Sequence, residues 1–354
     1  MRTKGVVVVP NSTCPTGPWL GVTRAPSLQR VANRPIVCHV LDALAAAGAS
    51  QVAIAMPADV AEEIAQCVLD EGPAELELSY LLDDPQGAGE SLLHAVAGFV
   101  GQAPCILHRA DGLLGEPLLA AVAPDAQPRD SVLLVGNVTP QPAKLRLVAS
   151  AQPVGTDGDA SLAPYEVAGA CALAEGMLKS VVDDAGAPLE LLDFAAISSQ
   201  LARAGGSSEV RVARRWRHFT GDALELLDMN RAILDTLESE AIANPEEGNR
   251  FEGKIAIHPT ARVSSSVIVG PVMIGAEAHI SDSYIGPHTS IGERVRIEGA
   301  ELERSIVLAD ASVLYVGSRL VTSIVGRQAR IFRDFSMPRA LRLQVGEGDE
   351  VALC

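Results

Sequence analysis

The 354-residue chain is long enough for two domains that each bury a core. Its 48% apolar and 20% charged residues are typical of a globular protein and exclude a disordered one. The formal net charge of −16 argues against a nucleic-acid partner, because the field of the chain repels a polyanionic backbone. A nucleotide stays possible, since backbone N–H groups and one or two cations bind it.

The sequence contains no run of 18 apolar residues, and its N-terminus does not resemble a signal peptide. We therefore expect a cytoplasmic protein with no membrane partner. The cysteines show no CxxC spacing, which predicts reduced thiols and no cysteine metal site. They are Cys14, Cys38, Cys67, Cys105, Cys171 and Cys354.

The first two-thirds of the chain alternate between strand and helix patterns. A β-branched run from Gly5 to Val9, ended by Pro10, predicts a strand that is buried on both faces. This alternation favours parallel pairing with right-handed crossovers. The further elements that we expect are helices over 36–47, 58–69, 89–100 and 116–122, and strands over 51–56, 75–82, 104–108 and 131–138.

Ligands of such sheets bind at the carboxyl ends of the strands. Three stretches are predicted to meet there: Pro10–Gly21, Asp83–Ser91 and His108–Gly115. The polar stretch Glu238–Lys254 contains both charges and helix breakers, so it marks the domain boundary. We expect an α/β domain over 1–240, a linker over 241–255 and a second domain over 256–354.

In the last third, aliphatic residues recur at steps of 6, 5 and 6, which sum to 17 residues. Three short strands per turn, each with one inward aliphatic residue, describe a triangular parallel β-helix. A β-sandwich is the alternative, but its strands are spaced more widely and less regularly. The regularity decays after Val313. The predicted columns are Ile257, Ile274 and Ile291; Val263, Ile280 and Ile297; and Ile268, Ile285 and Leu302.

Several stretches together carry a resemblance to a known family. They are VANRPIVCHVLDALAAAGASQVAIAM, DPQGAGESLLHAV, LLDMNRAILDTLE, the repeat VIVGPVMIGAEAHISDSYIGPHTSIGERVRIEGAELERSIVL and the tail MPRALRLQVGEGDEV. On these stretches the chain resembles the long-form glucose-1-phosphate thymidylyltransferases of deoxysugar and antibiotic pathways. The resemblance implies a Rossmann-like (GT-A-like) nucleotidyltransferase domain followed by a left-handed parallel β-helix. By analogy it also implies a homo-oligomer formed through the β-helix.

The family reaction joins dTTP and glucose 1-phosphate into dTDP-glucose and releases pyrophosphate. Catalysis of this kind rests on positioning the reactants and neutralising phosphate charge with Mg²⁺, Lys and Arg. The resemblance thus implies Mg²⁺ as the cofactor. It implies a nucleotide, a nucleotide sugar or a sugar phosphate as the ligand.

The nucleotide loop departs from the family pattern GGxGTRL. The corresponding stretch is PNSTCPTGPWLGVT, in which prolines remove N–H donors that a phosphate needs. Gly17 lies at its centre, and Asn11, Ser12 and Thr13 supply the polar donors that remain. We name these four residues as the candidate nucleotide loop.

Two further nucleotide contacts of the family are also changed. Pro26 stands where the family has a Lys before the VAN motif. Asp83 lies near the position of the base-reading Gln, and an Asp cannot donate as an amide does. The glycine turn that follows survives as Gly87 and Gly89, which are either turn glycines or glycines that let a phosphate approach.

The metal-binding motifs are only partly kept. In HRADGLL, Asp111 falls on the Mg²⁺-binding position, although a turn Asp is also common there. In RRWRHFTGDAL, Phe219 replaces the second metal-binding Asp, and Gly221 matches the motif glycine. On the sugar side the EKP motif is not recognisable, whereas Gly169 matches the glycine before the next strand.

His108, Arg109 and His218 are placed by the alignment at the mouth of the pocket. They are candidates for acid–base chemistry, with Asp111, or for binding an anion; the alternative is a solvated loop.

Loss of one charge-stabilising group typically costs roughly 100- to 1000-fold in rate, and four or five such groups are changed. Three hypotheses follow: an active nucleotidyltransferase with a remodelled site, a degenerate homologue that binds a ligand or partner subunit, or a pocket reused for another reaction. We favour the degenerate homologue, a pseudoenzyme.

Overall fold

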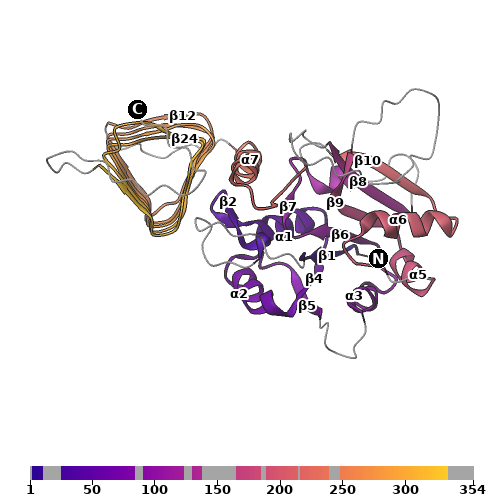
Figure 1. Cartoon of the computed structure of the whole chain (residues 1–354). Helices are drawn as coiled ribbons and strands as arrows, with labels where there is room; N and C mark the ends of the chain where they lie inside the picture. The colour runs from indigo at the N-terminus through magenta and orange to yellow at the C-terminus, as the bar shows by residue number, and fades with distance from the viewer. Residues whose placement is uncertain are drawn as a thin grey trace, which may run out of the picture.

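The computed structural model describes residues 2–10, 25–83, 91–122, 130–137, 165–184, 189–213, 216–238 and 248–333. The described part of the chain forms an α/β domain and a triangular β-helix that lie side by side (Figure 1). The candidate nucleotide loop lies outside the described residues, as does Gly87. Within the described ranges, no helix is long and apolar enough to cross a membrane.

A seven-stranded sheet forms the centre of the α/β domain. The predicted strands are present, and β1 pairs in parallel with β4 and β6. The expectation of parallel pairing needs one correction, because β9 runs antiparallel between β6 and β8 and makes the sheet mixed. The strand order is β10 (Ser208–Ala213), β8 (Ser131–Asn137), β9 (Tyr165–Leu173), β6 (Cys105–Arg109), β1 (Lys4–Val8), β4 (Gln51–Pro57) and β5 (Glu77–Asp83).

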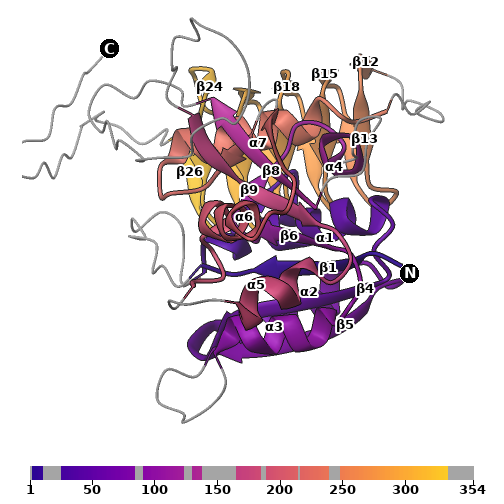
Figure 2. The ribbon, with the colours of Figure 1, turned by 90° about the vertical axis from the view of Figure 1, so that its right-hand side faces the viewer.

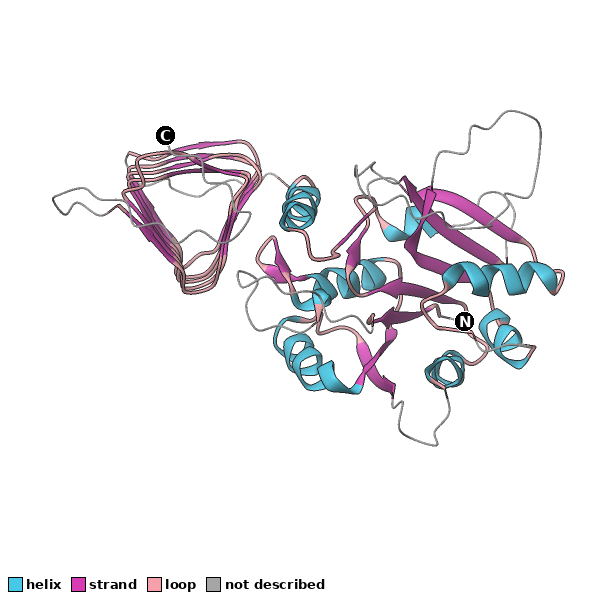
Figure 3. Ribbon diagram, viewed as in Figure 1, coloured by secondary structure: helices cyan, strands magenta, loops and turns pink. Residues whose placement is uncertain are grey.

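Both faces of the sheet are covered, so alternate side chains of β1 enter different cores. Val7 packs in one hydrophobic cluster, whereas Val6 and Val8 pack in the other. This burial on both faces explains the continuous β-branched run in the sequence. The first face is covered by α1 (Ile36–Ala46), α2 (Ala61–Glu71) and α4 (Leu118–Val122), and the second by α3 (Leu92–Val100), α5 (Met177–Asp183) and α6 (Phe194–Arg203). Figure 3 shows helices on both sides of the sheet, with α7 (Ala223–Leu234) between the α/β domain and the β-helix.

The predicted β-helix and its stacking register are confirmed. Ile257 pairs with Ile274 and Ile274 with Ile291, and the other two predicted columns are likewise in register. The coils lie next to one another in Figure 2. Its three sheets comprise β12 (Arg250–Glu252), β15 (Val267–Val269), β18 (Tyr284–Ile285), β21 (Glu301–Glu303) and β24 (Leu320–Val321); β13 (Ile255–Ile257), β16 (Val272–Ile274), β19 (Thr289–Ile291), β22 (Ile306–Val307) and β25 (Ile324–Val325); and β14 (Arg262–Ser264), β17 (His279–Ser281), β20 (Arg296–Glu298), β23 (Ser312–Leu314) and β26 (Arg330–Phe332).

The apparent decay of the repeat after Val313 does not end the coil. Ile297 pairs with Val313 and Val313 with Ile331, so the column continues although the spacing changes. A turn that gains or loses a residue at a corner keeps its inward side chains stacked. The loss of the strict 17-residue period after Val313 therefore marks a change of spacing within the β-helix and not its end.

The two domains are joined by buried polar contacts as well as by the chain. Asn230 of α7 is fully buried; its Oδ1 accepts from the Ala32 N–H at 2.8 Å, and its amide donates to the His288 carbonyl at 3.1 Å. The Asn33 amide donates to the Ile291 carbonyl at 2.7 Å. Ala32 and Asn33 form the turn of a hairpin between β2 (Arg30–Val31) and β3 (Arg34–Pro35), so this hairpin rests on the β-helix.

Candidate functional site

The candidate site lies at the carboxyl end of β6, where the chain leaves the sheet. After β6 the chain forms β7 (Gly112–Leu113), which pairs antiparallel with β11 (Arg217–His218). The Phe219 N–H donates to the Asp111 carbonyl at 2.9 Å. The structure therefore brings together the two segments in which the family resemblance places the metal-binding residues.

Arg109 and Asp111 form an ion pair through two hydrogen bonds. The Arg109 Nε donates to Oδ1 of Asp111 at 3.0 Å and Nη2 donates to Oδ2 at 2.7 Å. Only 3% of the Asp111 side chain is exposed, against 28% of the Arg109 side chain. A carboxylate this deeply buried needs a compensating charge, and Arg109 supplies it. The sequence named both residues but not their pairing.

Trp216 packs beside this pair in a space that two glycines leave open. A Cβ built on Gly112 would lie 2.1 Å from the indole ring. One on Gly169 would lie 2.5 Å from Cδ of Arg109 and 2.7 Å from the same ring. Both positions therefore require glycine for close packing. Gly112 was not among the predicted site residues, and Gly169 was predicted to bind the ligand.

His108 is held as a neutral ring beneath the site. It is 1% exposed, its Nδ1 donates to the Arg109 carbonyl at 2.7 Å, and its ring meets Trp216 edge-on at 5.9 Å. Burial lowers the pKa of His108 to about 4. A ring of such low basicity is a poor general base near neutral pH. The His218 ring stacks on the Trp216 ring with 6.1 Å between the ring centroids, and His218 is partly exposed.

The residues present do not fit the Mg²⁺ site that the family resemblance implies. Both carboxylate oxygens of Asp111 are hydrogen bonded to Arg109. At the position of the second ligand, Phe219 contributes a 1% exposed apolar side chain. Across the described ranges no group of three or more His, Cys, Asp or Glu residues is arranged to hold a metal. Mg²⁺ binds oxygen ligands with strict octahedral geometry, and this site presents no open set of them.

Other predicted residues are dispersed. Asp83 ends β5, which β4 and β1 separate from β6, so Asp83 lies at the far edge of the sheet from Asp111. Gly221 adopts a φ of 116° in the turn before α7, a conformation that favours glycine. In the same turn the Thr220 N–H and hydroxyl both donate to Glu225. Gly221 therefore has a structural role at the start of α7.

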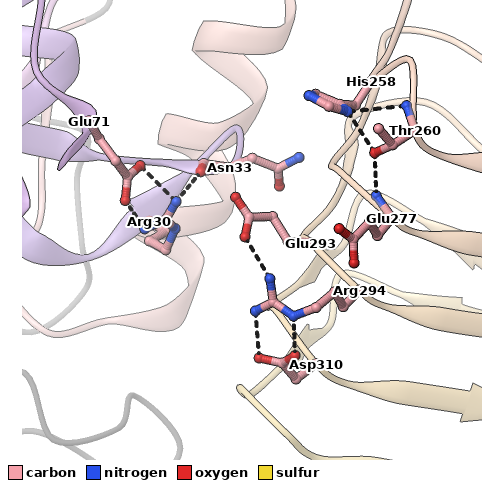
Figure 4. A network of polar contacts seen from close by, with 9 residues as sticks. All are labelled: Arg30, Asn33, Glu71, His258, Thr260, Glu277, Glu293, Arg294 and Asp310. Carbon is pink, nitrogen blue, oxygen red and sulfur yellow. Dashed lines mark hydrogen bonds and ion pairs between the residues drawn. The ribbon is translucent and has the colours of Figure 1, made fainter.

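A cavity lies between the domains, away from Asp111. It has a volume of about 160 Å³, and its lining includes Arg30, Asn33, Glu71 and Arg294. Figure 4 shows two ion pairs at this cavity: Arg30 with Glu71 at 2.7 and 2.8 Å, and Arg294 with Asp310 at 2.7 and 3.0 Å. In each of these pairs a carboxylate compensates the charge of the arginine, so we interpret the cavity as part of the contact between the domains.

Comparisons with known proteins agree with the architecture. The chain is 27% identical over 341 residues to a glucose-1-phosphate thymidylyltransferase from Streptomyces antibioticus, with 94% of each chain covered. It is 28% identical to a protein of the same name from Streptomyces griseus, with 92% of each covered. A low-salt glycan biosynthesis nucleotidyltransferase from Haloferax volcanii is 26% identical, over 91% of this chain and 92% of that one.

No protein-family model matches the chain. A crystal structure of a Bacillus anthracis protein, provisionally named a glucose-1-phosphate thymidylyltransferase, is 14% identical with a TM-score of 0.48, covering 68% of this chain and 98% of that one. This last likeness is too low to carry an argument. The relatives by sequence match the α/β domain and the β-helix together. The resemblance of this chain to the long-form glucose-1-phosphate thymidylyltransferases is thus confirmed over nearly its whole length.

Proposed function

We propose that this protein binds a phosphorylated ligand in the pocket of its α/β domain without the Mg²⁺-dependent turnover of its relatives. The ligand class is a nucleotide, a nucleotide sugar or a sugar phosphate of the kind used in deoxysugar pathways. The relatives' names and the shared architecture support the ligand class. The altered metal-binding segments support the loss of turnover.

The observation that carries this proposal is the ion pair of Arg109 with Asp111 beside the apolar Phe219. A divalent ion at Asp111 would have to share the carboxylate with the guanidinium, which already occupies one lone pair of each oxygen. The ion would lie close to that positive charge and would have a single carboxylate, because Phe219 replaces the second one. A fixed arginine also keeps the site electrically neutral in the absence of metal, so ligand binding there does not require Mg²⁺.

Thermal shift measurements test the binding part of the proposal. The protein would be titrated with dTTP, dTDP-glucose and glucose 1-phosphate, each in excess Mg²⁺ and in EDTA. A ligand at 100 times its dissociation constant stabilises the folded state by about 2.7 kcal/mol, which is a shift of several degrees. We expect the same shift in both media for at least one of the three ligands. No response to any of them would refute the proposed ligand class.

Pyrophosphate release from dTTP and glucose 1-phosphate tests the catalytic part, with the Streptomyces griseus relative as the positive control. We expect a rate at least about 1000-fold below that of the relative, because more than one charge-stabilising group is missing. Mg²⁺-dependent release at a comparable rate would refute the loss of turnover and favour an active enzyme with a remodelled site.

We further propose a homo-oligomer that forms through the β-helix. Large apolar side chains are exposed there, among them Val267 (36%), Val321 (47%) and Phe332 (57%). Val267 and Val321 belong to the same sheet, β12-β15-β18-β21-β24. Strands β18 and β21 lie between these two valines, so the proposal rests on the resemblance to a family that assembles through its β-helix and not on a continuous apolar patch. Light scattering that gives the mass of one chain would contradict this assembly.

A further inference from the structure

Two cysteine thiols meet where α1 packs against α2. Cys38 of α1 is fully buried, whereas Cys67 of α2 is partly exposed. Both belong to the same hydrophobic cluster, and their side chains are hydrogen bonded to each other. The two residues are 29 positions apart in the sequence, so the contact exists only because the helices pack together.

The two thiols have different acidities. The hydrogen bond from Cys38 lowers the pKa of the Cys67 thiol and outweighs burial and the charge of Glu71, which both raise it. The same hydrogen bond and burial raise the pKa of Cys38. Since the thiolate is the nucleophile, Cys67 is the more reactive partner, and it is also the one that solvent reaches. Cys38 is then a neighbouring thiol within reach of any product formed on Cys67.

The other described cysteines lack this combination. Cys105 and Cys171 lie on paired strands β6 and β9 and are buried, and burial raises the pKa of both thiols, that of Cys105 to about 12. Neither presents an exposed, acidic thiol. They provide an internal reference for oxidation within the same protein.

We propose that Cys38 and Cys67 are a site of reversible oxidation that forms an intramolecular disulfide on reaction with a peroxide. The Cys67 thiolate attacks one peroxide oxygen, the O–O bond breaks, and Cys67 becomes a sulfenic acid while hydroxide leaves. The Cys38 sulfur then attacks the Cys67 sulfur, the S–O bond breaks, and water leaves. In total two thiols and one hydrogen peroxide give one disulfide and two waters, with two electrons passing from sulfur to the peroxide.

The disulfide would join the first turn of α1 to the second half of α2. The C-terminal end of α2 is already fixed by Glu71, whose carboxylate pairs with Arg30 (Figure 4). The Glu71 carbonyl also accepts from Arg34 at 2.7 Å. Glu71 and Arg30 also line the interdomain cavity. Oxidation therefore acts on the part of the α/β domain that faces the β-helix, and not on the site around Asp111.

The test treats the full-length protein with a small excess of hydrogen peroxide and maps its peptides by mass spectrometry without reduction. We expect one cross-linked peptide that contains Cys38 and Cys67, a mass lower by two hydrogen atoms, and full reversal by dithiothreitol. We also expect a melting temperature higher by about 5 °C, because a cross-link restricts the unfolded chain. A Cys14→Ser/Cys354→Ser background removes the two cysteines outside the described residues from the analysis.

Two variants separate the roles of the thiols. Cys38→Ser should leave Cys67 as a sulfenic acid that dimedone captures, and Cys67→Ser should abolish both the cross-link and dimedone labelling. Cys105→Ser is the matched control and should leave the cross-link unchanged. The proposal is overturned if the unmodified protein gives no Cys38–Cys67 peptide, or if Cys105 and Cys171 oxidise as fast as Cys67.

Discussion

Replacing Arg109 by Met tests whether the ion pair with Asp111 is required by the fold. The substitution keeps most of the aliphatic stem, which packs against Gly169, and removes only the charged group. Breaking a buried ion pair costs roughly 3–5 kcal/mol, since the remaining charge stays buried without a partner. Because 28% of the Arg109 side chain is exposed, water offsets part of this cost. We expect a loss of about 3 kcal/mol in the free energy of unfolding.

Urea denaturation at pH 7, followed by circular dichroism, measures this loss. The double variant Arg109→Met/Asp111→Asn removes the orphaned charge, so the two substitutions should couple by about 2 kcal/mol in a double-mutant cycle. Arg217→Met is the matched control, because Arg217 donates to the Trp216 carbonyl and not to a buried carboxylate, and should cost less than about 1 kcal/mol. Additive effects of the two substitutions, within about 0.5 kcal/mol, would refute the reasoning.

Three further substitutions test separate features of the structure. Gly112→Ala places a methyl group against the Trp216 ring and should lower the free energy of unfolding by about 2 kcal/mol, measured by urea denaturation; an unchanged midpoint would contradict the packing. Burial lowers the pKa of His108 from 6.5 to about 4, so the folded state disfavours protonation of its ring. The free energy of unfolding should therefore be highest above pH 6.5 and should fall by about 3 kcal/mol as the pH falls to 4. His108→Gln should flatten the pH profile by that amount, and parallel profiles would refute the burial effect. Asn230→Ala leaves a buried N–H and a carbonyl without their partner and should cost about 2–3 kcal/mol by the same assay, whereas a loss below about 0.5 kcal/mol would contradict the interdomain contact.

The fold could be predicted from the sequence because its two periodicities are strong. Val6, Val7 and Val8 indicate a doubly buried strand, and the spacing of Ile257 and Ile274 gives the β-helix register directly. The antiparallel strand β9 was not predicted, because the direction of a strand after a long connection leaves no mark on its own residues. The β-helix continues past Val313, where the 17-residue spacing is lost, because a corner absorbs one residue without disturbing the stack.

The candidate site was less predictable, because its character depends on pairings across the chain. The family resemblance places Asp111 and Phe219 at the two metal-binding positions, and the structure joins their backbones by a hydrogen bond. The alignment did not show that Arg109 neutralises Asp111, since an arginine two residues away is equally compatible with an exposed loop. The contact of Trp216 with Gly112 was also not predicted, because a glycine in this segment is equally compatible with an ordinary turn.

The contact between α7, the hairpin and the β-helix has a consequence for how the protein unfolds. Ile306 of the β-helix is 3% exposed and belongs to the hydrophobic cluster of the α/β domain, and Asn230 bonds to both sides of the boundary. Cutting the chain in the linker would uncover apolar surface on both fragments and strand the hydrogen-bonding groups of Asn230. The two parts that the sequence divides at residues 241–255 thus keep separate cores but share the contact around Ile306 and Asn230, so we expect each part to lower the thermal stability of the other when it unfolds.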